Sequence, residues 1–264
     1  DVYPNGKADV NEFHEAGGVA AFIGSLLDGG YLFSDVETLI GNDLNIYRNK
    51  IEIVNNELVW ETQSKILDQT IIRDTNNPFN KTGGLKLMEG NIGRGIIKTS
   101  SLKSSVSCIE GHALVFNSQE DVLEAFGLGE LNKDCIIVVR GQGPSANGMP
   151  ELHKLTSPLN VLQSKGYTVA ILTDGRMSGA SGSIPAVIHI SPEANAGGVI
   201  GRIMNNDKIK IDINNGTFEL QVDQKVLEER DLYKAPSNPE GIGRELFKSF
   251  RNSVQSVESG ASVF

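Results

Sequence analysis

Hydrophobic residues near the N-terminus recur at helical spacing, from Val10 to Leu27. Asp9 precedes this pattern and Glu12 follows three residues later, a spacing typical of the capping box that begins many helices. The pair Gly17-Gly18 interrupts the pattern, and Gly29-Gly30 ends it. We therefore predict two short helices, or one kinked helix, in the first part of the chain.

The rest of the chain is richer in strand patterns than in helical ones. Polar and apolar residues alternate around Asn-containing turns, which predicts two β-hairpins, at residues 51–60 and 208–220. Short apolar runs predict further strands at residues 95–98, 113–116, 135–139 and 168–172. Cap residues and apolar spacing predict helices at residues 118–126, 150–166 and 241–254. This mixture predicts an α/β fold with a mixed, barrel-like sheet and flanking helices.

The composition excludes several classes of protein. The 264 residues carry a formal net charge of −9, which disfavours binding to nucleic acid or to anionic membranes. No apolar run approaches the length that spans a bilayer and no secretory signal is visible, so we expect a cytoplasmic protein. The two cysteines, Cys108 and Cys135, are too few for a disulfide scaffold or a four-ligand metal site. Cys135 lies in an apolar run, and we interpret it as a buried, inert thiol.

Glycine is frequent, with 29 residues, and three polar stretches are rich in it: residues 83–94, 141–151 and 173–182. The second and third stretches each follow a predicted buried strand, where backbone amides can bind an oxyanion. None of the three ends in the Gly-Lys-Ser/Thr of a nucleotide-binding loop, and none opens a first β–α–β unit as a dinucleotide site does. The third also lacks the glycine two residues before the serine that a hydrolase elbow requires.

Two residues in these stretches are candidates for chemistry. Glu151 is expected at the start of a helix, where it either interacts with the helix dipole or binds a hard cation such as Mg²⁺. Ser178 is flanked by small residues and serves either as a turn hydroxyl or as a reactive group. No histidine is close to Ser178 in sequence, although His153 and His189 could approach it in space.

Four longer segments form distinctive motifs: Asn77-Pro-Phe-Asn80, Gly90-Asn-Ile-Gly-Arg94, residues 146–156 and residues 173–182. Together they resemble one enzyme family, that of the dihydroxy-acid and phosphogluconate dehydratases. The resemblance runs over essentially the whole chain but covers only the C-terminal part of such enzymes. Within the family, the string from Asn147 to Lys154, Asn-Gly-Met-Pro-Glu-Leu-His-Lys, is similar to the phosphogluconate branch.

The resemblance implies an architecture and a set of cofactors. It implies that residues 1–40 are a helical connection from an N-terminal domain, and that residues 41–264 form a barrel-like, swivelling β/β/α domain. It also implies a [4Fe–4S] cluster held by cysteines of that N-terminal domain, with a Mg²⁺ ion beside it. The expected partners are the protein's own N-terminal domain, a small sugar-acid substrate and a second copy in a homodimer. The chain alone is expected to be inactive.

The resemblance further implies roles for individual residues. Ser178 matches the base that removes the C2 proton of 6-phospho-D-gluconate, and Glu151 matches a glutamate that reaches Mg²⁺. The cluster and Mg²⁺ would act as Lewis acids while the C3 hydroxyl leaves, giving 2-keto-3-deoxy-6-phosphogluconate in the Entner–Doudoroff pathway. The predicted substrate-binding residues are Arg94, Asn147, Lys154, Asp174, Arg176 and Ser181. For Arg94, Lys154 and Arg176, a surface ion pair is an equal alternative.

Two positions depart from the family pattern and keep other functions open. In the family, a basic residue usually follows the Gly-Pro of the second stretch, and another follows the Ser-Gly-Ala-Ser-Gly of the third. This chain has Ser145 and Ser183 at these positions. A dihydroxy acid or a non-phosphorylated aldonate is therefore the alternative substrate. An alternative of another class is a non-catalytic domain that binds an anion or a partner.

Overall fold

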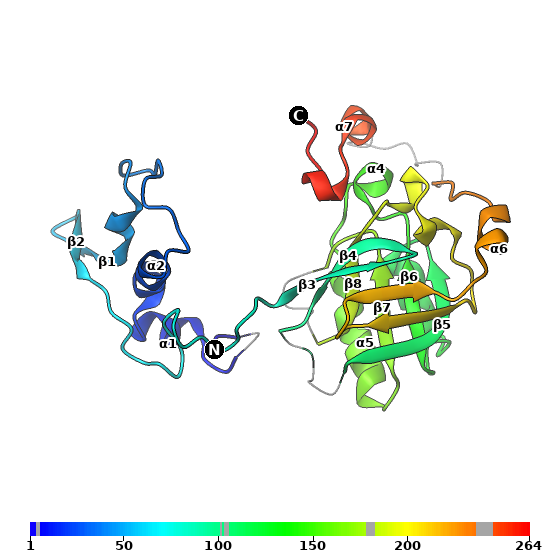
Figure 1. The fold of residues 1–264 in the computed structure, drawn as a ribbon, viewed down its shortest axis with the longest axis horizontal. Helices are drawn as coiled ribbons and strands as arrows, with labels where there is room; N and C mark the ends of the chain where they lie inside the picture. The colour runs from blue at the N-terminus through cyan, green and yellow to red at the C-terminus, as the bar shows by residue number, and fades with distance from the viewer. Residues whose placement is uncertain (4–5, 101, 103–105, 178–182, 236–244) are drawn as a thin grey trace. The chain divides into compact units, whose positions relative to one another are not determined.

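The computed structural model describes residues 1–3, 6–100, 102, 106–177, 183–235 and 245–264, with the side chains of 61 and 62 left aside (Figure 1). The described chain divides into two compact units, residues 1–83 and 84–264. The first contains a helical pair, a 3₁₀ helix and a hairpin: α1 (Val10–Glu15), α2 (Gly18–Asp28), η1 (Leu44–Arg48), β1 (Asn49–Val54) and β2 (Glu57–Gln63).

The N-terminal predictions agree with the first unit. Asp9 and Glu12 form the capping box, and the break at Gly17-Gly18 separates two helices. The predicted hairpin is present as β1 and β2. The units divide after Gly83, and the hairpin contacts α2 within the first unit. The predicted helical connection over residues 1–40 and the predicted barrel-like domain over residues 41–264 stay predictions. The link to an N-terminal domain stays a prediction.

The second unit is built on a closed eight-stranded barrel in the order β10-β3-β4-β8-β7-β6-β5-β9. Strands β5 to β8 are parallel neighbours, and the others pair antiparallel except at the β10–β3 closure. The predicted α/β fold with a mixed, barrel-like sheet is confirmed. The strands are β3 (Leu85–Gly90), β4 (Gly93–Lys98), β5 (Cys108–Phe116), β6 (Cys135–Val139), β7 (Val169–Thr173), β8 (Ala186–Ser191), β9 (Lys208–Asp212) and β10 (Thr217–Leu220).

Strand β6 is buried on both faces, which explains its continuous apolar sequence. Ile136 and Val138 pack inside the barrel in a cluster that includes Phe218. Ile137 and Val139 point the other way and pack in a second cluster with residues of the flanking helices. The Cys135 thiol is buried, as predicted, and burial raises its pKa to about 11, so it stays protonated at neutral pH.

The helices of the second unit are short. They are α3 (Gln119–Gly127), α4 (Pro144–Asn147), α5 (Thr156–Ser164), α6 (Gln224–Glu229) and α7 (Lys248–Ser253), with 3₁₀ turns η2 (His153–Leu155), η4 (Ala194–Ala196), η5 (Val199–Arg202) and η6 (Val257–Ser259). Ser118 caps α3 as predicted, and α7 lies beside α4 at one end of the barrel (Figure 1). None of the helices in the described ranges combines the length and apolar character that crossing a bilayer requires.

The structure differs from the local predictions in three places. The helix predicted to begin at Pro150 begins at Thr156, preceded by η2, because Glu151 forms an isolated parallel bridge with Arg176 and the N–H of Leu152 donates to the carbonyl of Arg176. Glu151 is therefore not at a helix start. The first glycine-rich stretch belongs to the β3–β4 hairpin, and strands β3 and β8 were not predicted.

Candidate functional site

The carboxyl ends of the four parallel strands meet at one edge of the barrel. In open α/β sheets this edge is where ligands bind. The segment after β6 contains residues 140–151, the segment after β7 begins at Asp174, and the segment after β8 contains Pro192 and Glu193. The second glycine-rich stretch and the described residues of the third, 173–177, therefore lie at the same edge.

Asp174 is fully buried and ties the three segments together. Its carboxylate accepts hydrogen bonds from the backbone N–H groups of Gly141 (3.1 Å), Gln142 (2.9 Å) and Ala194 (2.9 Å). Burial raises the pKa of this carboxyl, while the backbone donors act in the opposite direction. Asp174 was predicted to bind substrate, but the described contacts show it binding backbone, which orders the loops.

Glu193 occupies the beginning of α4. Gly143, at the N-cap, has no side chain to cap the helix. The two carboxylate oxygens of Glu193 instead accept hydrogen bonds from the N–H groups of Ser145 (2.9 Å) and Ala146 (3.1 Å). A Cβ at Gly143 would collide with this carboxylate, which explains the glycine. The oxyanion-binding amides predicted in the second stretch are thus filled by the protein's own side chain.

Glu151 and Arg176 are brought together by the fold. They form an isolated parallel bridge, and the N–H of Leu152 donates to the carbonyl of Arg176 at 3.0 Å. The guanidinium Nε of Arg176 donates to the carbonyl of Met149 at 2.8 Å, and its Nη1 lies 4.0 Å from Oε2 of Glu151. Both side chains remain partly exposed, so this pair presents a carboxylate and a cation to a ligand at the barrel edge.

Two other predicted site residues, Arg94 and Lys154, have ion-pair partners outside this pair. Arg94 pairs with Glu89 and Glu258 at 2.8 Å each, and Lys154 pairs with Glu120 at 3.2 Å, so both form the surface ion pairs of the alternative interpretation. Asn147 ends α4 and donates to Gln142 Oε1 at 3.0 Å. Ser178 and Ser181 lie outside the described residues, and their predicted roles stay predictions.

His189 was left undecided at the sequence level and lies beside the third stretch. Its backbone N–H donates to the carbonyl of Gly175 at 2.9 Å. Its half-buried ring interacts electrostatically with Arg176. Burial first, and that charge second, lower the pKa of His189, so the ring is neutral at pH 7. His153 is exposed on η2. Sequence reasoning missed the positions of Glu193 and His189 because it did not predict strand β8. His189 lies in this strand, and Glu193 follows it by two residues.

A pocket of about 480 Å³ lies between α4 and the C-terminal segment. Asn147, Gly148 and Met149 form one wall, and Phe247 and Phe250 of the α7 region form another. The pocket is mostly apolar with a few polar groups, which is the usual character of a small-molecule site. Its first wall is the loop that leads directly to Glu151.

The described residues fit part of a metal site but not a whole one. No group of three His, Cys, Asp or Glu side chains within the described ranges is placed to hold a metal ion. Glu151 supplies a single, partly exposed carboxylate, which suits one oxygen ligand of Mg²⁺. Cys108 is exposed and Cys135 is buried, and they do not form a cluster site. Among the described residues, Glu151 is the predicted metal ligand with a partly exposed carboxylate, and its part in a metal site stays a prediction.

Comparison with known proteins agrees with these features. The sequence profile described as "Dihydroxy-acid/6-phosphogluconate dehydratase C-terminal" matches residues 70–261. Phosphogluconate dehydratase of Pseudomonas aeruginosa is 47% identical over 265 residues, covering 100% of this chain and 44% of that protein. Phosphogluconate dehydratase of Escherichia coli K12 is 43% identical, covering 99% of this chain and 44% of that protein. Dihydroxy-acid dehydratase of Ignicoccus hospitalis is 32% identical, covering 99% and 45%.

The chain spans less than half the length of these curated relatives. The match over residues 70–261 contains the barrel, the Glu151–Arg176 pair and the Asp174 and Glu193 carboxylates. The chain therefore belongs to the dihydroxy-acid/6-phosphogluconate dehydratase family and contains the family's C-terminal domain.

Proposed function

We propose that the full-length protein to which this chain belongs dehydrates 6-phospho-D-gluconate to 2-keto-3-deoxy-6-phosphogluconate. The observation that carries the proposal is the similarity to phosphogluconate dehydratases, at 42–47% identity over essentially the whole chain. The dihydroxy-acid dehydratase of Ignicoccus hospitalis is less similar, at 32%. The reaction belongs to the Entner–Doudoroff pathway, and we expect the protein to act in the cytoplasm.

The chemistry assigned to this chain is limited to a few residues. Ser178 takes the proton from C2 of the sugar acid, and the C3 hydroxyl leaves, so that one water is lost in total. Arg176 lies within reach of the carboxylate of Glu151 and offers its cation to the substrate carboxylate beside it. Glu151 is one ligand of Mg²⁺. The Mg²⁺ ion and a [4Fe–4S] cluster supply Lewis acidity when bound.

The remaining ligands and the cluster cysteines are assigned to an N-terminal domain. The first unit supports such a partner because large apolar side chains are exposed on it, including Phe33 (81%), Leu39 (103%) and Ile53 (74%). Exposed apolar surface of this kind is typical of an interface. The relatives are long enough to supply a covering domain, because this chain spans only 44% of the Pseudomonas aeruginosa protein. A homodimer is proposed on the family resemblance.

The substrate assignment is tested by anaerobic dehydration assays on the full-length protein. We expect turnover of 6-phosphogluconate with a specificity constant at least tenfold higher than for gluconate or for a branched dihydroxy acid, since a site that binds a polar group rejects analogues that lack it. Equal turnover of gluconate would favour the aldonate alternative. Preferred turnover of the dihydroxy acid would favour the other branch of the family.

Two serines make this substrate test necessary. Ser145 donates its N–H to Glu193, and its hydroxyl accepts from Asn195 Nδ2 at 2.9 Å. Ser183 donates its hydroxyl to Asn160 Oδ1 at 2.9 Å. Neither position offers a cation to phosphate, so other residues must bind it if the proposal is right. No turnover of any sugar acid, with retained anion or partner binding, would support a non-catalytic domain.

Glu151→Gln is expected to weaken Mg²⁺ binding by the full-length protein at least tenfold, because a carboxamide keeps the shape but removes the charge that a hard cation requires. Mg²⁺ dissociation constants, measured by calorimetry on the iron-loaded protein, check this. Glu120→Gln is the matched control, since Glu120 is an exposed partner of Lys154. Unchanged Mg²⁺ affinity in Glu151→Gln would remove Glu151 from the metal site.

A further inference from the structure

A second pocket, of about 410 Å³, lies at the same barrel edge. It is lined near the ends of β5 and β6 by Asn117 and Arg140, on one side by residues 201–205, and on the other by residues 230–234. It shares no lining residue with the first pocket and contains neither Glu151 nor Arg176. No part of the function proposed above uses it.

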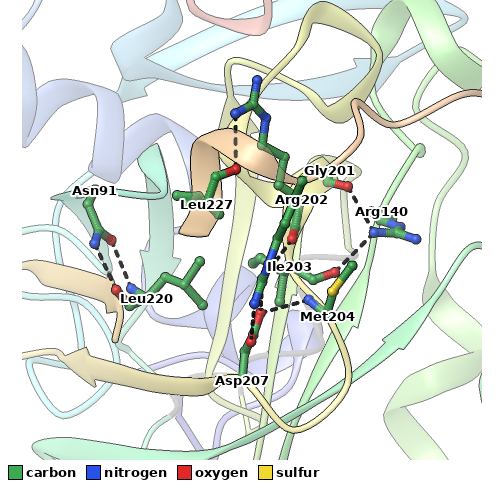
Figure 2. Close-up of polar contacts among 10 residues, drawn as sticks. Asn91, Arg140, Gly201, Arg202, Ile203, Met204, Asp207, Leu220 and Leu227 are labelled. Atoms are coloured by element: carbon green, nitrogen blue, oxygen red, sulfur yellow. Dashed lines mark hydrogen bonds and ion pairs between the residues drawn. The ribbon is translucent and has the colours of Figure 1, made fainter. Parts of the chain in front are cut away.

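Arg140, directly after β6, is fixed in the wall of this pocket. Its Nη1 donates to the carbonyls of Gly201 (2.9 Å) and Ile203 (3.1 Å), contacts that Figure 2 shows, and its Nε donates to Asn117 Oδ1 at 3.1 Å. The guanidinium also lies over the ring of Tyr233, 5.5 Å from its centroid. These contacts hold the cation in place before any ligand arrives, which lowers the entropy cost of binding.

Arg230 and Arg202 add two further cations. Arg230 forms a two-pronged ion pair with Asp207, with distances of 2.5 and 2.8 Å, and donates to the carbonyl of Arg202 at 3.0 Å. Asp207 is itself tied to the N–H of Met204 at 2.8 Å (Figure 2). Arg202 donates Nη1 to the carbonyl of Leu227 at 3.1 Å, whereas its buried Nε has no hydrogen-bond partner among the described residues. A buried donor of this kind is costly unless a ligand or water binds it.

The charge of the lining is unusual for this protein. Arg140, Arg202, Arg230 and Lys234 line the pocket, against one carboxylate, Asp231. Even after Asp207 neutralises Arg230, the cations exceed the acids, although the whole chain carries a net charge of −9. Arginine donors match the oxygens of phosphate in planar pairs. We propose that this pocket is a binding site for the phosphate group of a small phosphorylated anion.

The pocket touches the loop that leads to the candidate site. Gly141 follows Arg140 with a φ of 70°, a left-handed conformation that favours glycine, and a Cβ there would collide with the hydroxyl of Tyr233. The N–H of Gly141 donates to Asp174, whose carboxylate also fixes Gln142. The phosphate bound here comes either from the substrate or from a separate phosphorylated metabolite, and competition distinguishes the two sources.

The test is calorimetric titration of inorganic phosphate into the full-length protein in Mg²⁺-free buffer. Lys234→Met and Arg202→Met are each expected to weaken phosphate binding about tenfold, because each removes one charged donor. Lys165→Met is the matched control, since Lys165 is an exposed lysine outside the pocket lining, and it should leave the affinity unchanged. Lys234 is exposed at the rim, so its variant tests the site without disturbing the core.

Competition then identifies the source of the phosphate. If 6-phosphogluconate displaces phosphate from this site and gluconate does not, the phosphate group of the substrate binds here. If phosphate and 6-phosphogluconate bind together, the site serves a separate phosphorylated anion. Affinity for phosphate that is the same in wild type, Lys234→Met and Arg202→Met, or an absence of binding at millimolar phosphate, would overturn the proposal. The titration needs no turnover, so its outcome is independent of the dehydratase assay.

Discussion

Ser178→Ala in the full-length protein is expected to lower kcat for 6-phosphogluconate dehydration by about 10²–10⁴-fold, the range that a positioned proton-transfer group contributes. The reason is that the proposed base takes the C2 proton directly, and alanine offers no oxygen to accept it. KM and iron content should stay near the parent values, since Ser178 is assigned no binding or ligand role. Anaerobic initial-rate assays, with iron quantified in the same preparations, measure all three quantities.

The matched control is Ser183→Ala, five residues further along the chain. Ser183 donates its hydroxyl to Asn160, and this exposed contact has no assigned part in the chemistry. Its variant should retain nearly full activity. A Ser178→Ala variant with near-normal kcat would mean that this hydroxyl serves only the turn, and the proton acceptor would then have to be sought elsewhere. Loss of iron together with activity would instead assign Ser178 a structural role.

Asp174→Ala is expected to lower the free energy of unfolding by about 3 kcal/mol or more, because three buried backbone N–H groups lose their acceptor at once. Asp174→Asn should cost less, about 1–3 kcal/mol, since one side-chain oxygen still accepts while the amide nitrogen faces a donor. Urea unfolding followed by circular dichroism checks both values. Glu130→Ala, at an exposed position, is the control and should change stability little.

We also expect the free energy of unfolding to depend on pH through the Asp174 carboxyl, and this dependence distinguishes the wild type from the Asp174→Asn variant. Burial raises the pKa of Asp174 in the folded protein, so between the ordinary and the raised value the folded state binds more protons than the unfolded state. Stability contributed by Asp174 therefore falls as the pH rises through this window. The Asp174→Asn variant lacks this fall. A wild-type stability curve parallel to that of the variant would contradict the raised pKa.

The order of the candidate site depends on Asp174. Its three bonds join the segments after β6, β7 and β8, and the first two of these bring Glu151 and Arg176 together. Glu193 adds a second tie by capping α4. The barrel edge is thus ordered by two buried carboxylates that face backbone amides. Glycines at positions 141 and 143 make room for this arrangement because larger residues would collide with Tyr233 and Glu193.

The sequence by itself determined the features that depend on neighbouring residues. Caps at Asp9 and Ser118, the two hairpins and the doubly buried strands β6 and β7 follow from spacing of polar and apolar residues within a few positions. The family motifs likewise identified the two loops at the barrel edge. The role proposed for Ser178, as the base, rests on the sequence motif alone.

Only the tertiary structure decided the features that join distant residues. Strand β8 lies between β7, which precedes it in sequence, and the distant strand β4, and the β10–β3 pairing closes the barrel across more than a hundred positions. Pairing with Arg176 makes Glu151 extended, overriding the local preference for a helix that Pro150 indicated. From the sequence, Asp174 was predicted to bind substrate, and Glu193 was not identified. The partners of both carboxylates are backbone amides, which carry no sequence signature.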